Sequence, residues 1–151
     1  METIGDDRTV KAEVALAVLE RDDCWLLQLR DDDEKIVYPG QWGLFGGHLE
    51  PGERPADAMT RELNEEIGWN PPGPLRHWFS HDGGDRIAHI FLGKLSVSIS
   101  ELCLQEGQEI QLVTLEQIRQ GQIWSHVCQE TRPIVIGLKI VLERWMEGLN
   151  E

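Results

Sequence analysis

The sequence predicts one domain of the α/β (α+β) class, in which helices form a sandwich around a mixed β-sheet. Its 151 residues suit a single globular domain, and 40% of them are hydrophobic, which is enough for a core. Strand-like and helix-like segments follow one another without a regular β-α-β alternation, which favours a mixed sheet over a parallel one. The chain shows no internal repeat and no linker, so we expect this domain to span residues 1–151.

Strand patterns dominate the first third of the chain. Residues 9–20 are rich in Val and Leu with a two-residue alternation at their start, and residues 24–30 follow as a second apolar run after a turn at 21–23. These segments predict a β-hairpin. The charged residues 31–35 predict a solvated loop, and residues 41–45 predict a short strand that leads into a pair of glycines.

A helix is predicted from Pro55 to Ile67. Proline suits the first helical turn, because the N–H that it lacks would have no partner within the helix. Gly68 suits the position that follows the last helical residue. Met59, Leu63 and Ile67 recur at four-residue spacing, so they form an apolar stripe that we expect to face the core.

The remaining elements follow a Pro/Gly-rich loop. The sequence predicts strands at residues 75–80, 86–98 and 109–115, with a turn at 81–85 between the first two. Thr114 and Gln117 match a capping box, which predicts a short helix over residues 115–119. Apolar residues at helical spacing from about Pro133 to Gly148 predict a C-terminal helix packed on the sheet.

The net charge of the chain disfavours some classes of binding partner. Its 27 acidic and 14 basic residues give a net charge of -13, which repels nucleic-acid polymers and anionic membranes. The first ten residues lack the apolar core of a signal peptide, and no apolar run approaches the ~20 residues of a membrane span. Cys24, Cys103 and Cys128 are odd in number and widely spaced, which argues against a disulfide framework. We therefore expect a cytoplasmic protein.

Three carboxylates stand close together on the predicted helix. Glu62, Glu65 and Glu66 lie at i, i+3 and i+4, which places them on one face, beside the apolar stripe. Like charges at this spacing cost roughly 0.2–0.5 kcal/mol for an exposed pair. Arg61 stands four residues before Glu65 but cannot neutralise three acids. Clustered carboxylates suit Mg²⁺ or Mn²⁺ bound together with substrate phosphates, and a solvated acidic helix face is the alternative.

The stretch around these glutamates resembles the signature box of the Nudix hydrolase family. The box reads Gly, five residues, Glu, seven residues, then Arg-Glu-aliphatic-x-Glu-Glu-x-Gly and an apolar residue. In this chain the matching positions are Gly47, Glu53, Arg61, Glu62, Leu63, Glu65, Glu66, Gly68 and Trp69. The tryptophan replaces a residue that is usually aliphatic, so we expect a change in packing there and no loss of metal binding.

The resemblance implies a Nudix-type α/β/α sandwich and the hydrolysis of a nucleoside diphosphate linked to another group. Carried over by position, it implies that Glu62, Glu65 and Glu66 bind Mg²⁺, with Mn²⁺ as a second choice, and that Arg61 orients a glutamate. It also implies that Glu53 supports the metal site or its loop and that Gly47 offers a carbonyl near the metal. MutT-like members bring in a glutamate from a later loop; Glu106 is the first candidate here and Glu109 the second.

The substrate is predicted only as a class. We favour a MutT-like nucleoside triphosphate pyrophosphohydrolase, while a nucleotide-sugar or ADP-ribose pyrophosphatase and a non-catalytic nucleotide sensor stay open. The cysteines show no motif of an isoprenoid diphosphate isomerase, which shares the fold. Trp42, Trp78 and Trp124 could stack on a base, although core packing is the better expectation for each of them. We expect a small-molecule partner, and a homodimer stays open.

Overall fold

A computed structural model describes residues 11–149 of the chain. Its strands are β1 (Ala12–Arg21), β2 (Cys24–Leu29), β3 (Trp42–Gly43), β4 (Phe45–His48), β5 (Arg76–Asp82), β6 (Arg86–Lys94), β7 (Glu109–Thr114), β8 (Gln122–Ser125) and β9 (Glu130–Pro133). Its helices are α1 (Pro55–Ile67), the 3-10 turn η2 (Ile99–Glu101), α2 (Leu115–Gln120) and α3 (Ile136–Leu149). The expected absence of a signal peptide, and the start of the first predicted strand, concern residues outside this range.

Within residues 11–149, seven strands form one mixed sheet and two form a separate hairpin. The main path runs β3-β2-β1-β6-β5, with β4 also paired to β1 and β7 also paired to β2. β1 and β6 are parallel over nine residue pairs, and the other pairings are antiparallel. The mixed sheet predicted from the sequence is confirmed.

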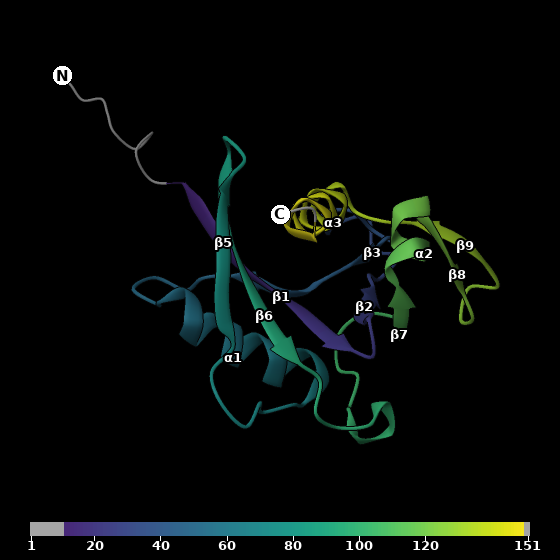
Figure 1. Ribbon diagram of the computed structural model, residues 1–151, viewed down its shortest axis with the longest axis horizontal. Coiled ribbons are helices and arrows are strands. Elements are labelled where there is room, and N and C mark those ends of the chain that lie inside the picture. Colours follow the sequence, from purple (N-terminus) through teal and green to yellow (C-terminus); the bar gives the residue numbers. More distant parts are fainter. Residues whose placement is uncertain (1–10, 150–151) are drawn as a thin grey trace.

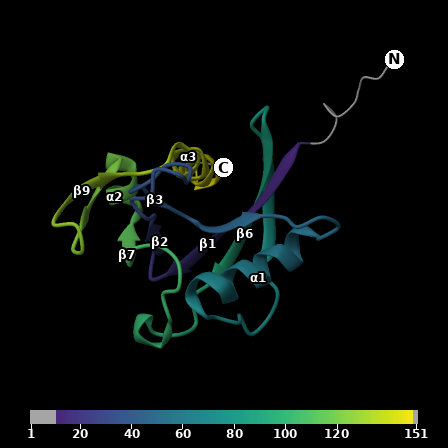
Figure 2. The same ribbon diagram turned by 180° about the vertical axis from the view of Figure 1, so that it is seen from behind.

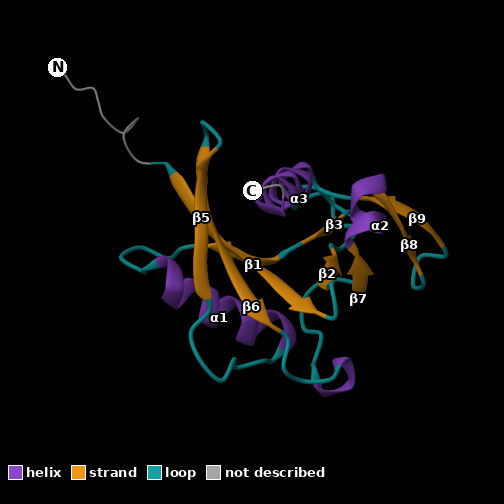
Figure 3. Cartoon of the chain, in the orientation of Figure 1, coloured by secondary structure: helices purple, strands orange, loops and turns teal. Residues whose placement is uncertain are grey.

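Alternation along the strands sends apolar side chains to both faces of this sheet. In β1, Ala17 and Leu19 pack towards α1, while Val18 packs towards α3. The predicted stripe of α1 is fully buried against the first face. Leu138 and Val141 of α3 cover the second face. Figures 1 and 3 show the resulting layers, with α1 and α3 on opposite sides of the strands.

The hairpin of β8 and β9 was not predicted from the sequence. It pairs Gln122 with Pro133 and Ser125 with Glu130, and it lies with α2 at the end of the molecule away from β5 (Figure 2). Its residues are largely polar and lack a clear alternation, so no strand pattern reveals them. Because Pro133 ends β9, α3 begins three residues later than the prediction placed it, at Ile136.

The described part of the chain shows the state of the cysteines and whether a helix could span a membrane. All three thiols are free, as expected, and Cys103 is exposed while the other two are partly buried. Over residues 11–149, no helix is both long enough and apolar enough to cross a membrane.

Candidate functional site

A tight turn before α1 fixes where the acidic face of the helix lies. Glu50 N donates to Glu53 Oε1 at 2.9 Å, and Glu53 N donates to the Glu50 carbonyl at 2.9 Å. Gly52 within this turn has a φ of +77°, which glycine adopts without strain. The helix ends at Gly68, whose backbone N–H donates to the carbonyl of Asn64. Both ends of α1 are thus defined by local backbone contacts.

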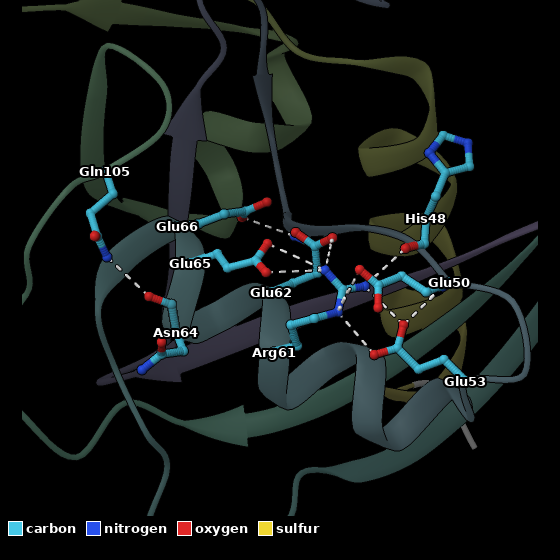
Figure 4. A network of polar contacts seen from close by, with 10 residues as sticks. His48, Glu50, Glu53, Arg61, Glu62, Asn64, Glu65, Glu66 and Gln105 are labelled. Carbon is cyan, nitrogen blue, oxygen red and sulfur yellow. Dashed lines mark hydrogen bonds and ion pairs between the residues drawn. The ribbon is translucent and has the colours of Figure 1, made fainter.

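Arg61 lies at the centre of the acidic face (Figure 4). Its Nε and Nη2 each donate to one oxygen of Glu53 at 2.9 Å, which is a bidentate pair. Its Nη1 contacts Glu62 Oε2 at 3.2 Å and Glu65 Oε1 at 3.3 Å, and Nη2 also donates to the carbonyl of His48 at 3.1 Å. The hydrogen bonds from Arg61 lower the pKa of Glu53 to about 2, so this carboxyl is ionised at neutral pH.

Glu66 is the one carboxylate of the box that is buried, with 1% of its surface exposed. Its Oε1 accepts a hydrogen bond from Gly46 N at 3.1 Å. Burial raises the pKa of Glu66, and the hydrogen bond with Glu62 and the nearby charge of Glu106 raise it further. Among residues 11–149, no lysine or arginine forms an ion pair with it. With no cation bound, Glu66 is therefore held in its neutral, protonated form, and a cation would be needed to stabilise its carboxylate.

The backbone of β4 lies directly against the carboxylates. A Cβ atom on Gly47 would stand 2.5 Å from Glu62 Oε2, so the glycine leaves the space that this carboxylate fills. Gly46 has a φ of +139°, and a Cβ there would stand 1.9 Å from the carbonyl oxygen of Ala15. Gly47 therefore lets the acidic face of α1 approach the strand, while Gly46 lets β4 lie close to the backbone of β1.

Glu106 lies in the loop before β7 and lines the same cleft as Glu62 and Glu65. Partial burial raises its pKa, and the negative charge of Glu62 adds to this effect. Gln28 Nε2 donates to the backbone carbonyl of Glu106 at 2.7 Å and fixes the loop at this point. The structure thus brings the first loop candidate next to the box.

Glu109, the second loop candidate, is used elsewhere. It accepts hydrogen bonds from Ser125 Oγ at 2.7 Å and from the N–H groups of His126 and Val127 at 3.2 Å each. Burial raises its pKa, but these bonds and one from Gln111 outweigh burial, so the pKa of Glu109 is lowered overall. Its carboxylate holds the turn between β8 and β9 and lies outside the cleft.

A cleft of about 570 Å³ joins these parts. Its acidic end holds Arg61, Glu62, Glu65 and Glu106, and a second hollow of about 460 Å³ adjoins it. Residues shared by both hollows are Leu16, Val37, Tyr38, His48, Arg86 and Gly137. The second hollow is lined mainly by apolar residues of the sheet and of α3. One end of the cleft therefore suits phosphates with cations, and the other suits an apolar or planar group.

The fit of this site to a metal ion can be judged from its donors. In the described range of the chain, no three carboxylate, imidazole or thiol groups already stand close enough to hold a metal ion. The donor set nevertheless consists of carboxylate and carbonyl oxygens, which hard divalent cations prefer. Glu66 has no cationic partner among the described residues, and Arg61 holds oxygens of Glu62 and Glu65 that a bound ion would need. The residues present fit such an ion once Arg61 yields these contacts.

None of the tryptophans considered for base stacking lines either hollow. Trp42 is buried and donates its Nε1 hydrogen to the carbonyl of Ile123 at 3.1 Å. Trp78 packs edge-on against Phe79, and Trp124 is exposed on β8. Tyr38, which sequence patterns did not single out, lines both hollows, and Phe79 lines the second. Its only sequence signal is its position a few residues after the acidic run at 31–34.

Known proteins share the sequence pattern and the fold of this chain. A family model described as the NUDIX domain matches residues 10–127. Proteins from Salmonella arizonae and Salmonella newport named "Nucleoside triphosphatase NudI" are 44% identical over 55 residues. That alignment spans 36% of this chain and 38% of each relative, so it covers less than half of their length.

Solved structures resemble the fold over nearly the whole chain. The MutT protein from Methanosarcina mazei Go1 matches with a TM-score of 0.70 and 21% identity over 93% of this chain and 96% of its own. The NUDIX domain of Shewanella oneidensis NrtR, complexed with ADP ribose, matches with a TM-score of 0.68 and 18% identity over 96% of this chain and 94% of its own. A bifunctional NMN adenylyltransferase/ADP ribose pyrophosphatase from Francisella tularensis, complexed with AMP and a Mn ion, matches with a TM-score of 0.65 and 19% identity. The match covers 92% of this chain and 42% of that protein.

Proposed function

Because the chain belongs to the NUDIX domain family, we propose that it hydrolyses the pyrophosphate bond of a nucleoside diphosphate derivative with the help of Mg²⁺. The observation that carries this proposal is the group of carboxylates Glu62, Glu65 and Glu106 at the acidic end of a cleft of about 570 Å³, next to the buried Glu66, whose pKa is raised by burial and by Glu62. Such a group is stabilised by a cation, and a cation in this cleft is placed to attract phosphates.

The residues of the box have separate roles in this proposal. Glu62, Glu65 and Glu66 supply carboxylate oxygens for the ion, and Gly47 supplies a backbone carbonyl at the point where no side chain fits. Bound Mg²⁺ would neutralise charge on the phosphoryl oxygens and lower the pKa of the attacking water. Mn²⁺ is the second candidate for the same donors.

Three further residues complete the proposed site. Glu53 holds Arg61 through the bidentate pair, so the arginine stays over the glutamates that it orients. We assign to Glu106 the acceptance of the proton of the attacking water; its position in the cleft and its raised pKa support this role. Glu53, Arg61 and Glu106 therefore belong to the proposed machinery together with the ion ligands.

Among substrates, we favour a nucleoside triphosphate, cleaved by water to a nucleoside monophosphate and pyrophosphate. The name of the Salmonella relatives supports this choice, although the alignment covers only part of them. A nucleotide-sugar or ADP-ribose pyrophosphatase is the alternative, supported by the ADP ribose in the NrtR structure, and a non-catalytic nucleotide sensor is a third. We propose a small-molecule partner and a cytoplasmic location; a homodimer stays open.

The test is a panel of nucleoside triphosphates, nucleotide sugars and ADP-ribose with Mg²⁺, analysed for pyrophosphate, phosphate and sugar phosphate. We expect nucleoside monophosphate and pyrophosphate from at least one triphosphate. Glu65→Gln should lower turnover by at least about 100-fold with the fold retained, while Glu116→Gln on α2 should not change it. No turnover on the whole panel would favour the sensor, and full activity of Glu65→Gln would refute its role in holding the ion.

A further inference from the structure

The loop between β2 and β3 forms one wall of the cleft. Two backbone hydrogen bonds close its base, from Arg30 N to the Gln41 carbonyl and from Gly40 N to the Asp31 carbonyl, each at 2.9 Å. Residues 31–35 are exposed and charged, whereas the tip carries Val37 and Tyr38. The loop thus places two apolar side chains beside an acidic site.

Tyr38 occupies an unusual position in this loop. Its φ of +53° lies in the left-handed region, which a residue with a bulky side chain adopts at an energetic cost. The ring lines both hollows of the cleft and is 37% exposed. Val37 beside it and Ile136 at the start of α3 are 59% and 56% exposed. These three large apolar side chains are open to solvent around one hollow, where a planar group could be enclosed.

A long-range ion pair holds the loop in this position. Arg132 of β9 donates from Nη1 to Asp32 Oδ1 at 2.8 Å and from Nη2 to Asp32 Oδ2 at 3.3 Å. Its Nη1 also donates to the Gly40 carbonyl at 3.1 Å, and its Nε donates to Glu130 at 2.6 Å. These hydrogen bonds lower the pKa of Asp32, so the pair is ionised at neutral pH. One guanidinium therefore joins both ends of the loop to the β8–β9 hairpin.

Other contacts fit the same arrangement. Arg30 Nε donates to the Val37 carbonyl at 2.7 Å and fixes the backbone next to Tyr38. Gly40 has a φ of +66°, and a Cβ atom there would stand 2.2 Å from Arg132 Nη1 and 2.3 Å from Asp32 Oδ1. The glycine leaves the space through which the arginine reaches the loop.

We propose that Tyr38 is the wall against which the nucleobase of the substrate packs, and that Arg132 is a positioning residue that holds Tyr38 there through Asp32 and Gly40. The inference rests on the proposed function, because it assigns the apolar hollow to the base while the phosphates lie over the glutamates. Stacking a base on an aromatic ring tolerates different bases, so the ring sets affinity for a nucleotide over a bare polyphosphate.

A direct test uses the fact that Tyr38 is the only tyrosine of the chain. Protein labelled with ring-¹³C tyrosine gives the ring signals of one residue, which are followed by NMR during titration with AMP, GMP, CMP or UMP, and with inorganic pyrophosphate. We expect at least one nucleotide to shift the signals in a saturating manner and pyrophosphate to leave them unchanged. No shift with any of the four nucleotides, or an equal shift with pyrophosphate, overturns the proposal. The readout needs no turnover, so it fails or succeeds independently of the hydrolase assay.

Kinetics on the best substrate of the panel test the same contacts. Tyr38→Ala should raise KM by roughly 5- to 100-fold, the range expected for losing one base–aromatic stack, with kcat within about twofold, and Tyr38→Phe should retain the wild-type KM. Trp124→Ala, which removes an exposed aromatic ring outside the cleft, is the matched control. An unchanged KM in Tyr38→Ala would overturn the assignment.

Variants of Arg132 and Asp32 test the positioning role of Arg132 separately. Arg132→Ala should shift the Tyr38 signals in the nucleotide-free protein and raise KM with kcat retained, and Arg132→Lys should restore part of the affinity. Asp32→Asn breaks the pair from the other side and should give the same KM effect, should Arg132→Ala fail to fold. Arg119→Ala removes an exposed ion pair with Glu116 within α2, away from the loop, and should change neither the Tyr38 signals nor KM. A kcat loss without a KM change would overturn the positioning role.

Discussion

The Arg61 guanidinium holds the Glu53 carboxylate by two parallel hydrogen bonds of 2.9 Å, which join α1 to the turn that precedes it. The same group contacts Glu62 and Glu65, so one side chain sets the positions of three carboxylates. The pair therefore links the stability of the turn to the geometry of the proposed ion site. Replacing Arg61 tests both at once.

Arg61→Ala should destabilise the fold by about 1–3 kcal/mol, the range for losing hydrogen bonds to charged groups. Arg61→Lys keeps the charge but lacks the planar fork, so it should retain more stability than Arg61→Ala while turnover still falls. Urea unfolding and steady-state kinetics on the same samples measure the two effects. Wild-type turnover in Arg61→Lys would show that the fork geometry does not matter to the site.

Gly47→Ala should impair the site and spare the fold. The new Cβ would stand 2.5 Å from the end of the flexible Glu62 side chain, which can move aside, but the carboxylate then leaves its place. We expect turnover to fall by about 100-fold, as for a misplacement of about 1 Å, with a nearly unchanged melting temperature. Gly73→Ala, where nothing lies within 4 Å of the added atom, is the control and should behave as wild type.

Addition of a divalent ion should stabilise the folded protein. Burial and the neighbouring Glu62 raise the pKa of Glu66, so an ion that binds only the folded state would favour its carboxylate form and displace the proton. Mg²⁺ at about 100 times its dissociation constant would add about 2.7 kcal/mol. We expect a higher melting temperature with Mg²⁺ or Mn²⁺ than with EDTA.

Glu62→Gln provides the comparison for this metal effect. It should lose most of the Mg²⁺-dependent rise in melting temperature, because one carboxylate ligand becomes a neutral amide. If the wild-type protein melts at the same temperature in Mg²⁺ and in EDTA, the carboxylates do not bind an ion. The acidic face of α1 is then simply solvated, which is the alternative interpretation given above.

The sequence predicted α1 to the residue because its signals are local. The helix begins at Pro55 and is ended by Gly68, which has a φ of +62°. The buried stripe of apolar residues lies between these two positions. Strands β1 and β2 of the sheet could likewise be predicted, because their runs of apolar residues are visible in the local sequence. Caps and periodicity act within a few residues, which is why they can be seen in one chain.

The missed features depend on contacts between distant parts of the chain. Tyr38 gains its surroundings from α3, and its loop is held by Arg132, one hundred residues after Asp32. Likewise, Glu109 and Glu106 have similar sequence contexts, yet Ser125 lies over Glu109 and not over Glu106. No propensity or spacing rule contains these neighbours, so the sequence left both glutamates as candidates for one role.

The pH dependence of stability should reveal the structural role of Glu109. Its pKa in the folded protein is lowered from the ordinary value of a glutamic acid, since the hydrogen bonds from Ser125 and the β8–β9 turn favour the anion and outweigh the effect of burial. A lowered pKa means that the stabilisation is present in full above about pH 5 and is lost as the pH falls through the folded value. Glu109→Gln places an amide against donors and should cost about 1–3 kcal/mol at pH 7.

Urea unfolding of wild type and Glu109→Gln at pH 7, 5 and 3 measures this dependence. The difference between the two proteins should be equal at pH 7 and pH 5 and smaller at pH 3, because protonated Glu109 resembles glutamine as a hydrogen-bonding group. Glu116→Gln on the exposed face of α2 controls for the general effect of removing one negative charge. A difference that grows towards pH 3 would mean that the folded state favours the protonated acid, and the turn would then need another explanation for its conformation.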